Sequence, residues 1–162
     1  MSACADGGAA PGPGSDPRNW RDLVRRHLSR VFVHLVWATW NRRRIITPIV
    51  RPRLYRCLHS ECSRLGAQLV AVGGIKDHVH LLVRLPSTVC VSAAVKQLKG
   101  SSSHFVNHEV LEAPRFRWQG SYGAFSVSER ALPRVRDYIL RQEDHHRAGK
   151  VYRVFERCDH SA

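Results

Sequence analysis

The order of strand-like and helix-like segments along the chain is the feature that most constrains its fold. Segments rich in β-branched and aromatic residues and bounded by turn residues predict strands at residues 31–40, 68–73, 77–84 and 117–127. Segments with apolar residues at helical spacing predict helices at residues 47–66, 87–105 and 128–147. The resulting order is β-α-β-β-α-β followed by one more helix, which is typical of a ferredoxin-like α+β domain.

Capping residues mark the ends of the first two predicted helices. Thr47 followed by Pro48 is a start signal for the first helix, and Gly66 is expected to end it. Ser87 or Thr88 is expected to cap the second helix. The apolar residues of this second helix recur along one face, which predicts that it packs against the sheet.

Composition divides the chain into four parts. Residues 1–17 are rich in Ala, Gly, Pro and Ser and poor in large apolar residues, which predicts a disordered tail. Residues 18–30 form a basic N-terminal extension that contains a candidate short helix. Residues 31–147 are the predicted folded domain, and residues 148–162 are a short C-terminal tail.

The excess of positive charge narrows the classes of partner. Lys and Arg total 26 against 13 Asp and Glu, which gives a formal net charge of +13 and a sequence pI near 10.6. Such a surplus favours polyanionic partners, so nucleic acid is the first expectation and an anionic membrane surface the second. No apolar run approaches the roughly 18 residues that span a bilayer. The N-terminus also lacks the pattern of a secretory signal.

The cysteines favour a reducing compartment. Their number is odd, and no two of them form a C-x-x-C pair; they are Cys4, Cys57, Cys62, Cys90 and Cys158. This pattern argues against a disulfide framework and against a structural zinc site. We therefore expect a cytoplasmic protein whose cysteines are small buried hydrophobic residues.

The predicted strand at residues 77–84 carries the first candidate site. Because side chains alternate along a strand, His78 and His80 point away from the apolar core that the intervening residues enter. Two imidazoles at i and i+2 can each offer a neutral nitrogen to one divalent cation. With 10 histidines in 162 residues, about 0.6 such pairs arise by chance. Two histidines that only form hydrogen bonds are therefore the alternative.

The last predicted helix, from Ser128 through about Arg147, carries the second candidate site. On a helical wheel at about 100° per residue, Tyr138 lies at the seam between a buried apolar stripe and a basic stripe. Gln142 lies one turn later along the same edge. A phenol at such a seam is held rigidly and can reach solvent. A boundary tyrosine that only reaches water with its hydroxyl is the alternative.

Four blocks of sequence resemble the one-tyrosine HUH transposases. The blocks are DHVHLLV at 77–83, VKQLKG at 95–100, WQGSYGAFSVS at 118–128 and YILRQEDHHR at 138–147. They occur in the family's order and spacing between residues 31 and 147. The family comprises the single-strand transposases of the simplest insertion sequences, which are called IS200-like, and the REP-associated tyrosine transposases.

The resemblance implies a role for each residue of the two candidate sites. His78 and His80 would bind a divalent metal, Mg²⁺ or Mn²⁺, and Gln142 would complete the metal site. Tyr138 would attack single-stranded or hairpin DNA, leaving a 5′-phosphotyrosine and a free 3′ hydroxyl. His145 or a metal-bound water is our candidate for removing the phenol proton. The family also implies a homodimer, in which the tyrosine helix serves its own chain or its partner.

Physical chemistry supports this set of roles. A cation that polarises the non-bridging oxygens of a phosphodiester lowers the barrier to nucleophilic attack. A tyrosine hydroxyl has a pKa near 10 and therefore needs activation at neutral pH. Because one phosphodiester replaces another, rejoining the strands requires no nucleotide cofactor, and the sequence carries no Gly-rich phosphate loop.

Basic residues outside the catalytic set are candidates for contact with the DNA backbone, and a solvated face is the alternative for each. They are Arg42, Arg43, Arg44, Lys96 and Lys99. For Trp118 and Tyr122 we expect packing in the domain rather than stacking on DNA bases.

The chain departs from the family pattern in a few places. The residues at 75–76 stand where a Met-Pro pair is usual, Ser121 stands where glycine is frequent, and the tail after Phe155 and Glu156 is short. The short tail counts against dimerisation and against recognition of a DNA tip. The resemblance further implies a bacterial protein that is associated with the nucleoid when it is bound to DNA. The alternative function is a non-catalytic or domesticated nucleic-acid-binding module on the same fold. A histidine-rich metal-storage protein has only the histidine count to support it.

Overall fold

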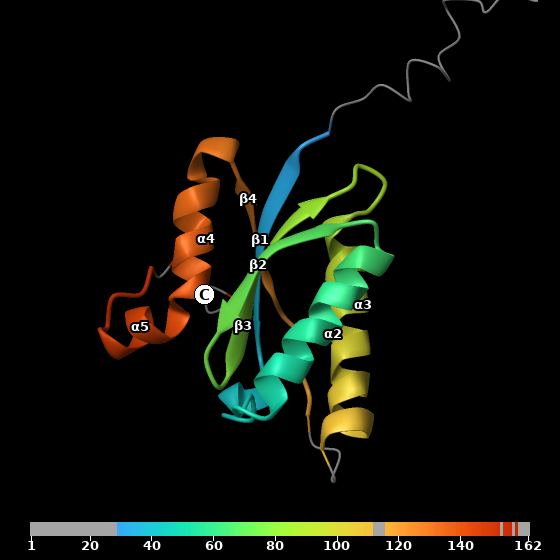
Figure 1. Cartoon of the computed structure of the whole chain (residues 1–162), viewed down its shortest axis with the longest axis vertical. Helices are drawn as coiled ribbons and strands as arrows, with labels where there is room; N and C mark the ends of the chain where they lie inside the picture. The colour runs from blue at the N-terminus through green and yellow to red at the C-terminus, as the bar shows by residue number, and fades with distance from the viewer. Residues whose placement is uncertain (1–28, 112–115, 153, 157, 159–162) are drawn as a thin grey trace, which may run out of the picture.

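The computed structural model describes residues 29–111, 116–152, 154–156 and 158. The tail predicted at 1–17 and most of the basic extension predicted at 18–30 lie outside the described residues. Within the described part, one sheet has helices on both of its faces (Figure 1).

The elements follow the predicted order, with the final helix divided in two. The strands are β1 (Val31–Ala38), β2 (Gln68–Gly74), β3 (His78–Leu85) and β4 (Gly123–Val127). The α-helices are α2 (Val50–Arg64), α3 (Val91–Phe105), α4 (Leu132–Leu140) and α5 (Gln142–Arg147). The short helical segments are η1 (Trp40–Arg42), η2 (Val106–Val110) and η3 (Glu129–Ala131).

The sheet has the strand order β2-β3-β1-β4, and every neighbouring pair is antiparallel. β3 therefore lies inside the sheet, where β1 and β2 hold it on both sides. Val36 of β1 lies opposite His80, and Ala38 lies opposite His78. This arrangement is that of a ferredoxin-like α+β domain, so the predicted fold class is confirmed.

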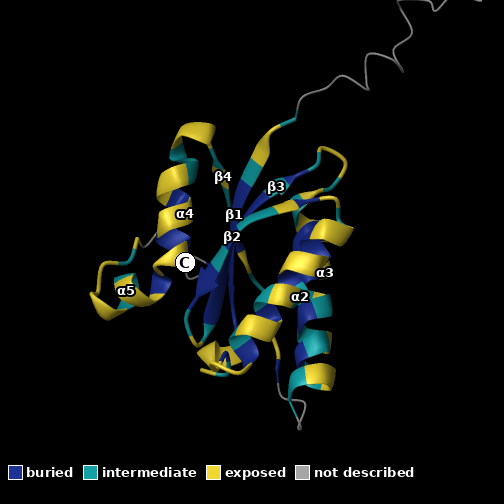
Figure 2. Cartoon of the chain, viewed as in Figure 1, coloured by how far each residue is buried: buried dark blue, intermediate teal, exposed yellow. Residues whose placement is uncertain are grey.

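The two faces of the sheet bury different residues. Helices α2 and α3 cover one face and α4 covers the other (Figure 1), and their outer sides are exposed (Figure 2). The odd-numbered residues of β3 enter the core beneath α2 and α3; they are Val79, Leu81, Val83 and Leu85. Leu82 instead packs beneath α4 with Val135 and Ile139. The predicted alternation is confirmed, and it directs the histidine pair toward α4.

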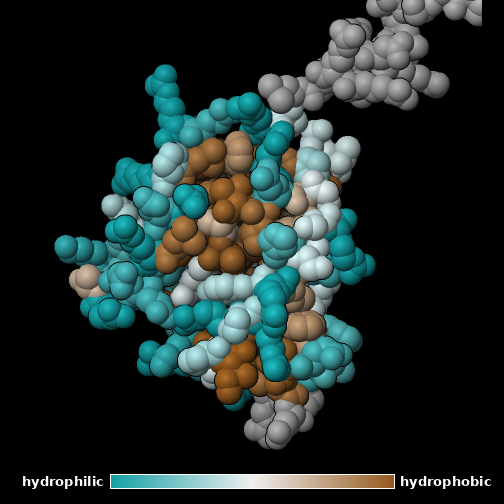
Figure 3. All heavy atoms as spheres, viewed as in Figure 1, coloured by the Kyte–Doolittle hydropathy of each residue, from teal (hydrophilic) through white to brown (hydrophobic). Residues whose placement is uncertain are grey.

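Apolar side chains gather between the two helical layers on the face seen in Figure 3, and hydrophilic residues surround them. None of the helices in the described part of the chain combines the length and the apolar character that crossing a membrane requires.

Glycine at position 73 allows α4 to approach β2 closely. A Cβ atom at Gly73 would lie 1.9 Å from the carbonyl oxygen of Ile139, far inside any real contact. Only a residue without a side chain fits there unless the helix is displaced. Because Tyr138 immediately precedes Ile139, this contact sets the distance of the tyrosine from the sheet.

The predicted ends of the first helix agree with the structure. Although α2 begins at Val50, its first free N–H donates to Oγ1 of Thr47 at 3.3 Å, so the threonine caps it. Gly66 follows the helix with φ of +67°, the left-handed conformation that glycine adopts most readily.

The predicted start of the second helix is wrong. Helix α3 begins at Val91, so neither Ser87 nor Thr88 caps it. These residues belong to a turn in which the N–H of Val89 donates to the carbonyl oxygen of Pro86 at 3.2 Å. The chain forms this turn first and starts the helix four residues after Ser87.

The prediction of one continuous last helix is also wrong. Helix α4 ends at Leu140, Arg141 leaves the helical conformation with φ of −104° and ψ of 24°, and α5 starts at Gln142. The break turns the residues after Arg141 relative to Tyr138. One helical wheel therefore cannot describe both parts of this segment.

The fourth strand is shorter than the predicted range of 117–127. Within the predicted range, residues 123–127 form β4 and pair with β1, and the residues before them contribute only an isolated bridge between Trp118 and Thr39. The ammonium of Lys99 on α3 donates to the carbonyl oxygens of residues 119–121 at 2.6–3.1 Å. These carbonyl groups bind a side chain, so they do not extend the strand. The first strand likewise ends at Ala38, two residues before the predicted end.

The described cysteines match their expectation only in part. Cys62 and Cys158 are buried, Cys57 is half-buried and Cys90 is exposed. Cys57, Cys62 and Cys90 carry free thiols. The interpretation as a small buried residue is therefore wrong for Cys90, which lies at the solvated start of α3.

Candidate active site

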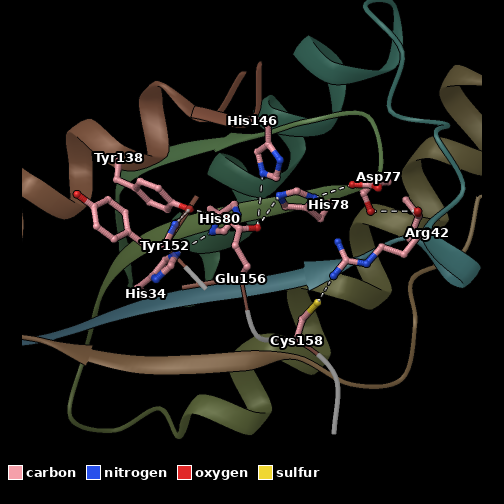
Figure 4. A network of polar contacts seen from close by, with 11 residues as sticks. His34, Arg42, Asp77, His78, His80, Tyr138, His146, Tyr152, Glu156 and Cys158 are labelled. Atoms are coloured by element: carbon pink, nitrogen blue, oxygen red, sulfur yellow. Dashed lines mark hydrogen bonds and ion pairs between the residues drawn. The ribbon is translucent and has the colours of Figure 1, made fainter. Parts of the chain in front are cut away.

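His78 and His80 lie side by side beneath α4, in the place that the alternation of β3 predicts. Their ring centroids are 4.9 Å apart, and their exposed fractions are 1% and 0%. Helix α4 and the C-terminal segment, by which we mean the described residues between 151 and 158, cover them (Figure 4). A buried imidazole costs free energy unless its nitrogens have partners.

Each histidine has a partner at Nδ1. Nδ1 of His78 lies 2.6 Å from Oδ1 of Asp77, and Nδ1 of His80 lies 2.9 Å from Nε2 of His34. Because the carboxylate of Asp77 accepts a hydrogen bond, neutral His78 carries its hydrogen on Nδ1 and its lone pair on Nε2. Burial and then His80 lower the pKa of His34 to about 3. His34 is therefore neutral and can accept the Nδ1 hydrogen of His80.

The Nε2 atoms of both histidines are left without a hydrogen-bond partner in the buried site. The ligand atoms of His78, His80 and Glu156 all lie within 4.8 Å of one another. Buried nitrogen atoms of native proteins rarely lack a partner. Two imidazole lone pairs and a carboxylate that face one point form a donor set suited to a divalent cation.

Glu156 of the C-terminal segment is the site residue that the sequence did not predict. One carboxylate oxygen lies 3.2 Å from Nε2 of His78, and the other lies 3.4 Å from Nε2 of His80. Nε2 of His146 lies 3.6 Å from Oε2 of Glu156. Burial alone would raise the pKa of Glu156, but the contacts with His78 and His80 hold it well below its usual range. Glu156 is therefore a carboxylate at neutral pH.

Tyr138 extends from α4 into the same cluster. Its hydroxyl donates a hydrogen bond to Oε1 of Glu156 and accepts one from the backbone N–H of Tyr152 at 3.3 Å. The ring lies 6.0 Å from that of His80 between centroids. Burial and then Glu156 raise the pKa of Tyr138. The nucleophile predicted from the sequence is thus a protonated phenol that needs a proton acceptor in order to react.

Helix α5 contributes three further residues in or near this cluster, Gln142, His145 and His146. Gln142 is only 1% exposed, and both atoms of its amide lack a hydrogen-bond partner. The ring of His145 lies 5.0 Å from that of Tyr138, and the ring of His146 lies 5.0 Å from that of His78. The structure therefore brings the predicted His145 to the tyrosine. It also brings His146, for which the sequence predicted no role, to the histidine pair.

A comparison with known families decides the class of protein. The family described as "Transposase IS200 like", with the designation Y1, matches residues 27–142. The chain belongs to the IS200-like transposase family. Over 125 aligned residues it is 27% identical to the ISDra2 transposase TnpA of Deinococcus radiodurans. The alignment covers 74% of this chain and 89% of that protein.

Solved structures agree with this membership. A crystal structure from Deinococcus radiodurans R1, assigned as a transposase, is 30% identical and gives a TM-score of 0.58, covering 71% of this chain and 92% of that one. A REP-associated tyrosine transposase bound to a REP hairpin gives a TM-score of 0.57 and covers 78% of this chain and 74% of that one. At 17% identity, this second likeness supports the fold alone.

Membership in the IS200-like family identifies this chain as a DNA-binding protein of DNA transposition and recombination. The resemblance stated from the four sequence blocks is confirmed. The excess of basic residues is the expected property of a protein that binds the DNA backbone.

The basic residues predicted to contact DNA lie in two places in this transposase. Arg43 and Arg44 are exposed after β1, beside Arg42, whose Nη2 donates to Sγ of Cys158 at 3.4 Å. Lys96 and Lys99 line a cavity of about 400 Å³ between α3 and the segment that leads to β4. Trp118 is buried in the wall of this cavity and Tyr122 is 37% exposed, so the expected packing holds more fully for the tryptophan.

Replacing Lys99 with methionine is expected to destabilise the protein by about 1–3 kcal/mol, because three backbone carbonyl groups lose their donor. Methionine keeps the reach of the side chain but not its charge. Chemical denaturation followed by circular dichroism measures the change. Lys96→Met, an exposed change on the same helix, is the control and is expected to stay within about 0.5 kcal/mol. An equal loss in the two variants would contradict this role.

Proposed function

We propose that this transposase cleaves and rejoins single-stranded DNA through a covalent bond between Tyr138 and the 5′ phosphate of the cleaved strand. The observation that supports this proposal most directly is the carboxylate of Glu156, which contacts the phenol hydroxyl and faces both histidine Nε2 atoms. The nucleophile and the proposed metal ligands therefore meet around one group within a single chain. A boundary tyrosine turned toward water would not have this arrangement.

In this proposal His78 and His80 hold a divalent cation, Mg²⁺ or Mn²⁺, through Nε2. Asp77 and His34 orient the two rings by occupying Nδ1, which is the usual arrangement of histidine ligands. Gln142, whose buried amide lacks a partner, is proposed as a further ligand. The bound cation would polarise the scissile phosphate and offset the charge that develops on its oxygens.

Tyr138 supplies the nucleophile in this reaction. Its phenolic oxygen bonds to phosphorus, and the bond from phosphorus to the 3′ oxygen breaks, which leaves a 5′-phosphotyrosine and a 3′ hydroxyl. Attack by a 3′ hydroxyl on that phosphotyrosine reverses the reaction and restores the phenol. The phenol hydrogen points at Oε1 of Glu156, whereas His145 lies against the ring of Tyr138. Oε1 of Glu156 is therefore the proposed first acceptor of the phenol proton, and His145 or a water on the cation would take the proton from there. The leaving 3′ oxygen gains its proton from solvent.

The substrate in this proposal is an unpaired or hairpin DNA strand. Arg42, Arg43 and Arg44 lie beyond the end of β1, on the side of Asp77 and the proposed metal ligands, and they are proposed to contact phosphates near the cleaved bond. Lys96 and Lys99 are proposed contacts farther along the strand. A homodimer that acts on DNA in the bacterial cytoplasm is also part of the proposal. Light scattering after size-exclusion chromatography measures its mass.

The test of the proposed function is formation of a covalent adduct. The full chain is incubated with single-stranded oligonucleotides from its own genomic flanks and Mn²⁺ or Mg²⁺, and the products are separated on a denaturing gel. We expect a protein–DNA band that requires the metal, is absent with fully duplex DNA, and maps to Tyr138 by mass spectrometry. Tight binding to many hairpins without an adduct would contradict the proposal and favour a non-catalytic binding module.

A further inference from the structure

We propose that the carboxylate of Glu156 is a ligand of the divalent cation, so that metal binding and docking of the C-terminal segment onto Tyr138 are one coupled event. This inference rests on the proposed metal site at His78 and His80. It assigns a metal ligand to a segment in which the sequence predicted only a short tail.

The distances around Glu156 fit those of neighbouring ligands on one ion. Mg²⁺ holds its octahedral ligands at about 2.1 Å, so adjacent ligand atoms lie about 3.0 Å apart. The carboxylate oxygens lie 3.2 Å from Nε2 of His78 and 3.4 Å from Nε2 of His80. These separations are close to the value expected for adjacent ligands. The ligand nitrogens of the two histidines lie within 4.8 Å of each other, so the two rings must close toward the carboxylate for all three donors to surround one cation.

The orientation of the donors also favours shared ligation over hydrogen bonding. Although the oxygens of Glu156 are near, Nε2 of His78 and Nε2 of His80 make no hydrogen bond to them or to any other described residue. When the rings are neutral and carry their hydrogens on Nδ1, a lone pair on each Nε2 faces the carboxylate, and this is repulsive unless a proton on the ring or a cation between the donors supplies positive charge. A divalent cation converts that repulsion into attraction.

The C-terminal segment is anchored on both sides of Glu156. On one side, the ring of Phe155 lies 5.3 Å from that of His34 and 5.5 Å from that of Tyr138. On the other side, Cys158 is buried, and its carbonyl oxygen accepts a hydrogen bond from the side chain of Gln119 at 3.1 Å. Figure 4 shows the carboxylate of Glu156 directed at the two histidines. The segment thus presents one negative charge to the site.

The charge balance of the site also favours Glu156 as a metal ligand. The side chain of Glu156 is only 15% exposed, and a buried carboxylate is costly unless a positive charge accompanies it. Two neutral imidazoles and an amide provide no negative charge to a cation, whereas Glu156 provides one.

Because Tyr138 is 2% exposed beneath this segment, DNA reaches the phenol only after the segment shifts. Loss of the metal contact would accompany that shift.

The test measures metal binding by the full chain in the absence of DNA. Titration calorimetry with Mn²⁺ is run on the wild type, Glu156→Gln and Glu156→Asp. Glu129→Gln is the control, because Glu129 is half-exposed and pairs with Arg30 instead. We expect Glu156→Gln to weaken Mn²⁺ binding by about 10- to 100-fold and Glu156→Asp to weaken it less. The control should stay within about twofold.

Two readouts separate a ligand from a residue that only supports the site. Water-proton relaxation should report one more exchangeable water on Mn²⁺ bound to Glu156→Gln than on Mn²⁺ bound to the wild type. Hydrogen exchange over residues 151–158 should slow when Mn²⁺ is added to the wild type but not when it is added to Glu156→Gln. Thermal denaturation in EDTA checks that each variant is folded. If Glu156→Gln does not fold, Glu156→Asp is compared with the wild type instead.

The results distinguish this inference from the proposed function. If His78→Ala loses Mn²⁺ binding while Glu156→Gln keeps the affinity and hydration of the wild type, the inference is overturned and the histidine site stands. Faster hydrogen exchange over residues 151–158 on addition of Mn²⁺ would also overturn it, because the metal would then be expelling the carboxylate. If the wild type binds no Mn²⁺, the proposed metal site itself is wrong.

Discussion

Replacing Tyr138 with phenylalanine is expected to abolish the covalent protein–DNA adduct and to slow strand cleavage on the order of 10⁴-fold or more, the scale seen when a covalent enzyme loses its nucleophile. Phenylalanine retains the ring that packs near His80 and Phe155 and loses only the hydroxyl. The two histidines and the basic surface are untouched, so DNA binding measured by fluorescence anisotropy should stay within about threefold.

Tyr152→Phe is the matched control for this prediction. Tyr152 packs against Tyr138 with ring centroids 5.2 Å apart, and it is the tyrosine that could replace it as a nucleophile. Only its backbone N–H contacts the hydroxyl of Tyr138, and phenylalanine preserves that group. The adduct should therefore persist in Tyr152→Phe. An adduct formed by Tyr138→Phe, or its loss in Tyr152→Phe with the fold intact, would refute the assignment of the nucleophile.

The sequence predicted the sheet and the histidine pair because both depend on local patterns. Alternation along β3 needs only the identity of successive residues, and it correctly separated His78 and His80 from the core. The order of strands and helices leaves few topologies, and the ferredoxin-like one has the observed strand order.

His34 could have been found from the sequence with one more step. It lies on the first predicted strand, and β1 pairs with β3 in the antiparallel sheet that the fold requires. Antiparallel register places it opposite Leu82, one position along the same face from His80. A third histidine on that face was therefore a detectable partner for the pair.

Glu156 could not be predicted in this way, because no periodicity connects it to the histidines. Its position depends on the break at Arg141 and on the chain that returns after α5. The same break made the helical wheel unreliable for the residues beyond it. A short segment without a strand or helix period gives no signal for the surface on which it docks.

Replacing Gly73 with alanine is expected to slow cleavage by about 10²-fold although residue 73 touches neither DNA nor metal in the proposed mechanism. The added Cβ would lie 1.9 Å from the carbonyl oxygen of Ile139, so α4 must move away from β2 by about 1.5 Å to restore an ordinary contact. That shift carries Tyr138 away from the histidines on β3. Misplacement of a reacting group by about 1 Å costs a reaction about two orders of magnitude.

Stability should fall in Gly73→Ala by about 1–3 kcal/mol, the usual cost of forcing an extra methyl group into a packed site. Gly100→Ala is the matched control, because a Cβ there meets no atom within 4 Å and the residue lies on the exposed side of α3. Removing a helical glycine should stabilise the protein by about 0.5–1 kcal/mol and leave cleavage unchanged. Urea denaturation and the rate of adduct formation measure the two effects separately. If Gly73→Ala cleaves at the rate of the wild type, the close approach of α4 to β2 does not position the tyrosine.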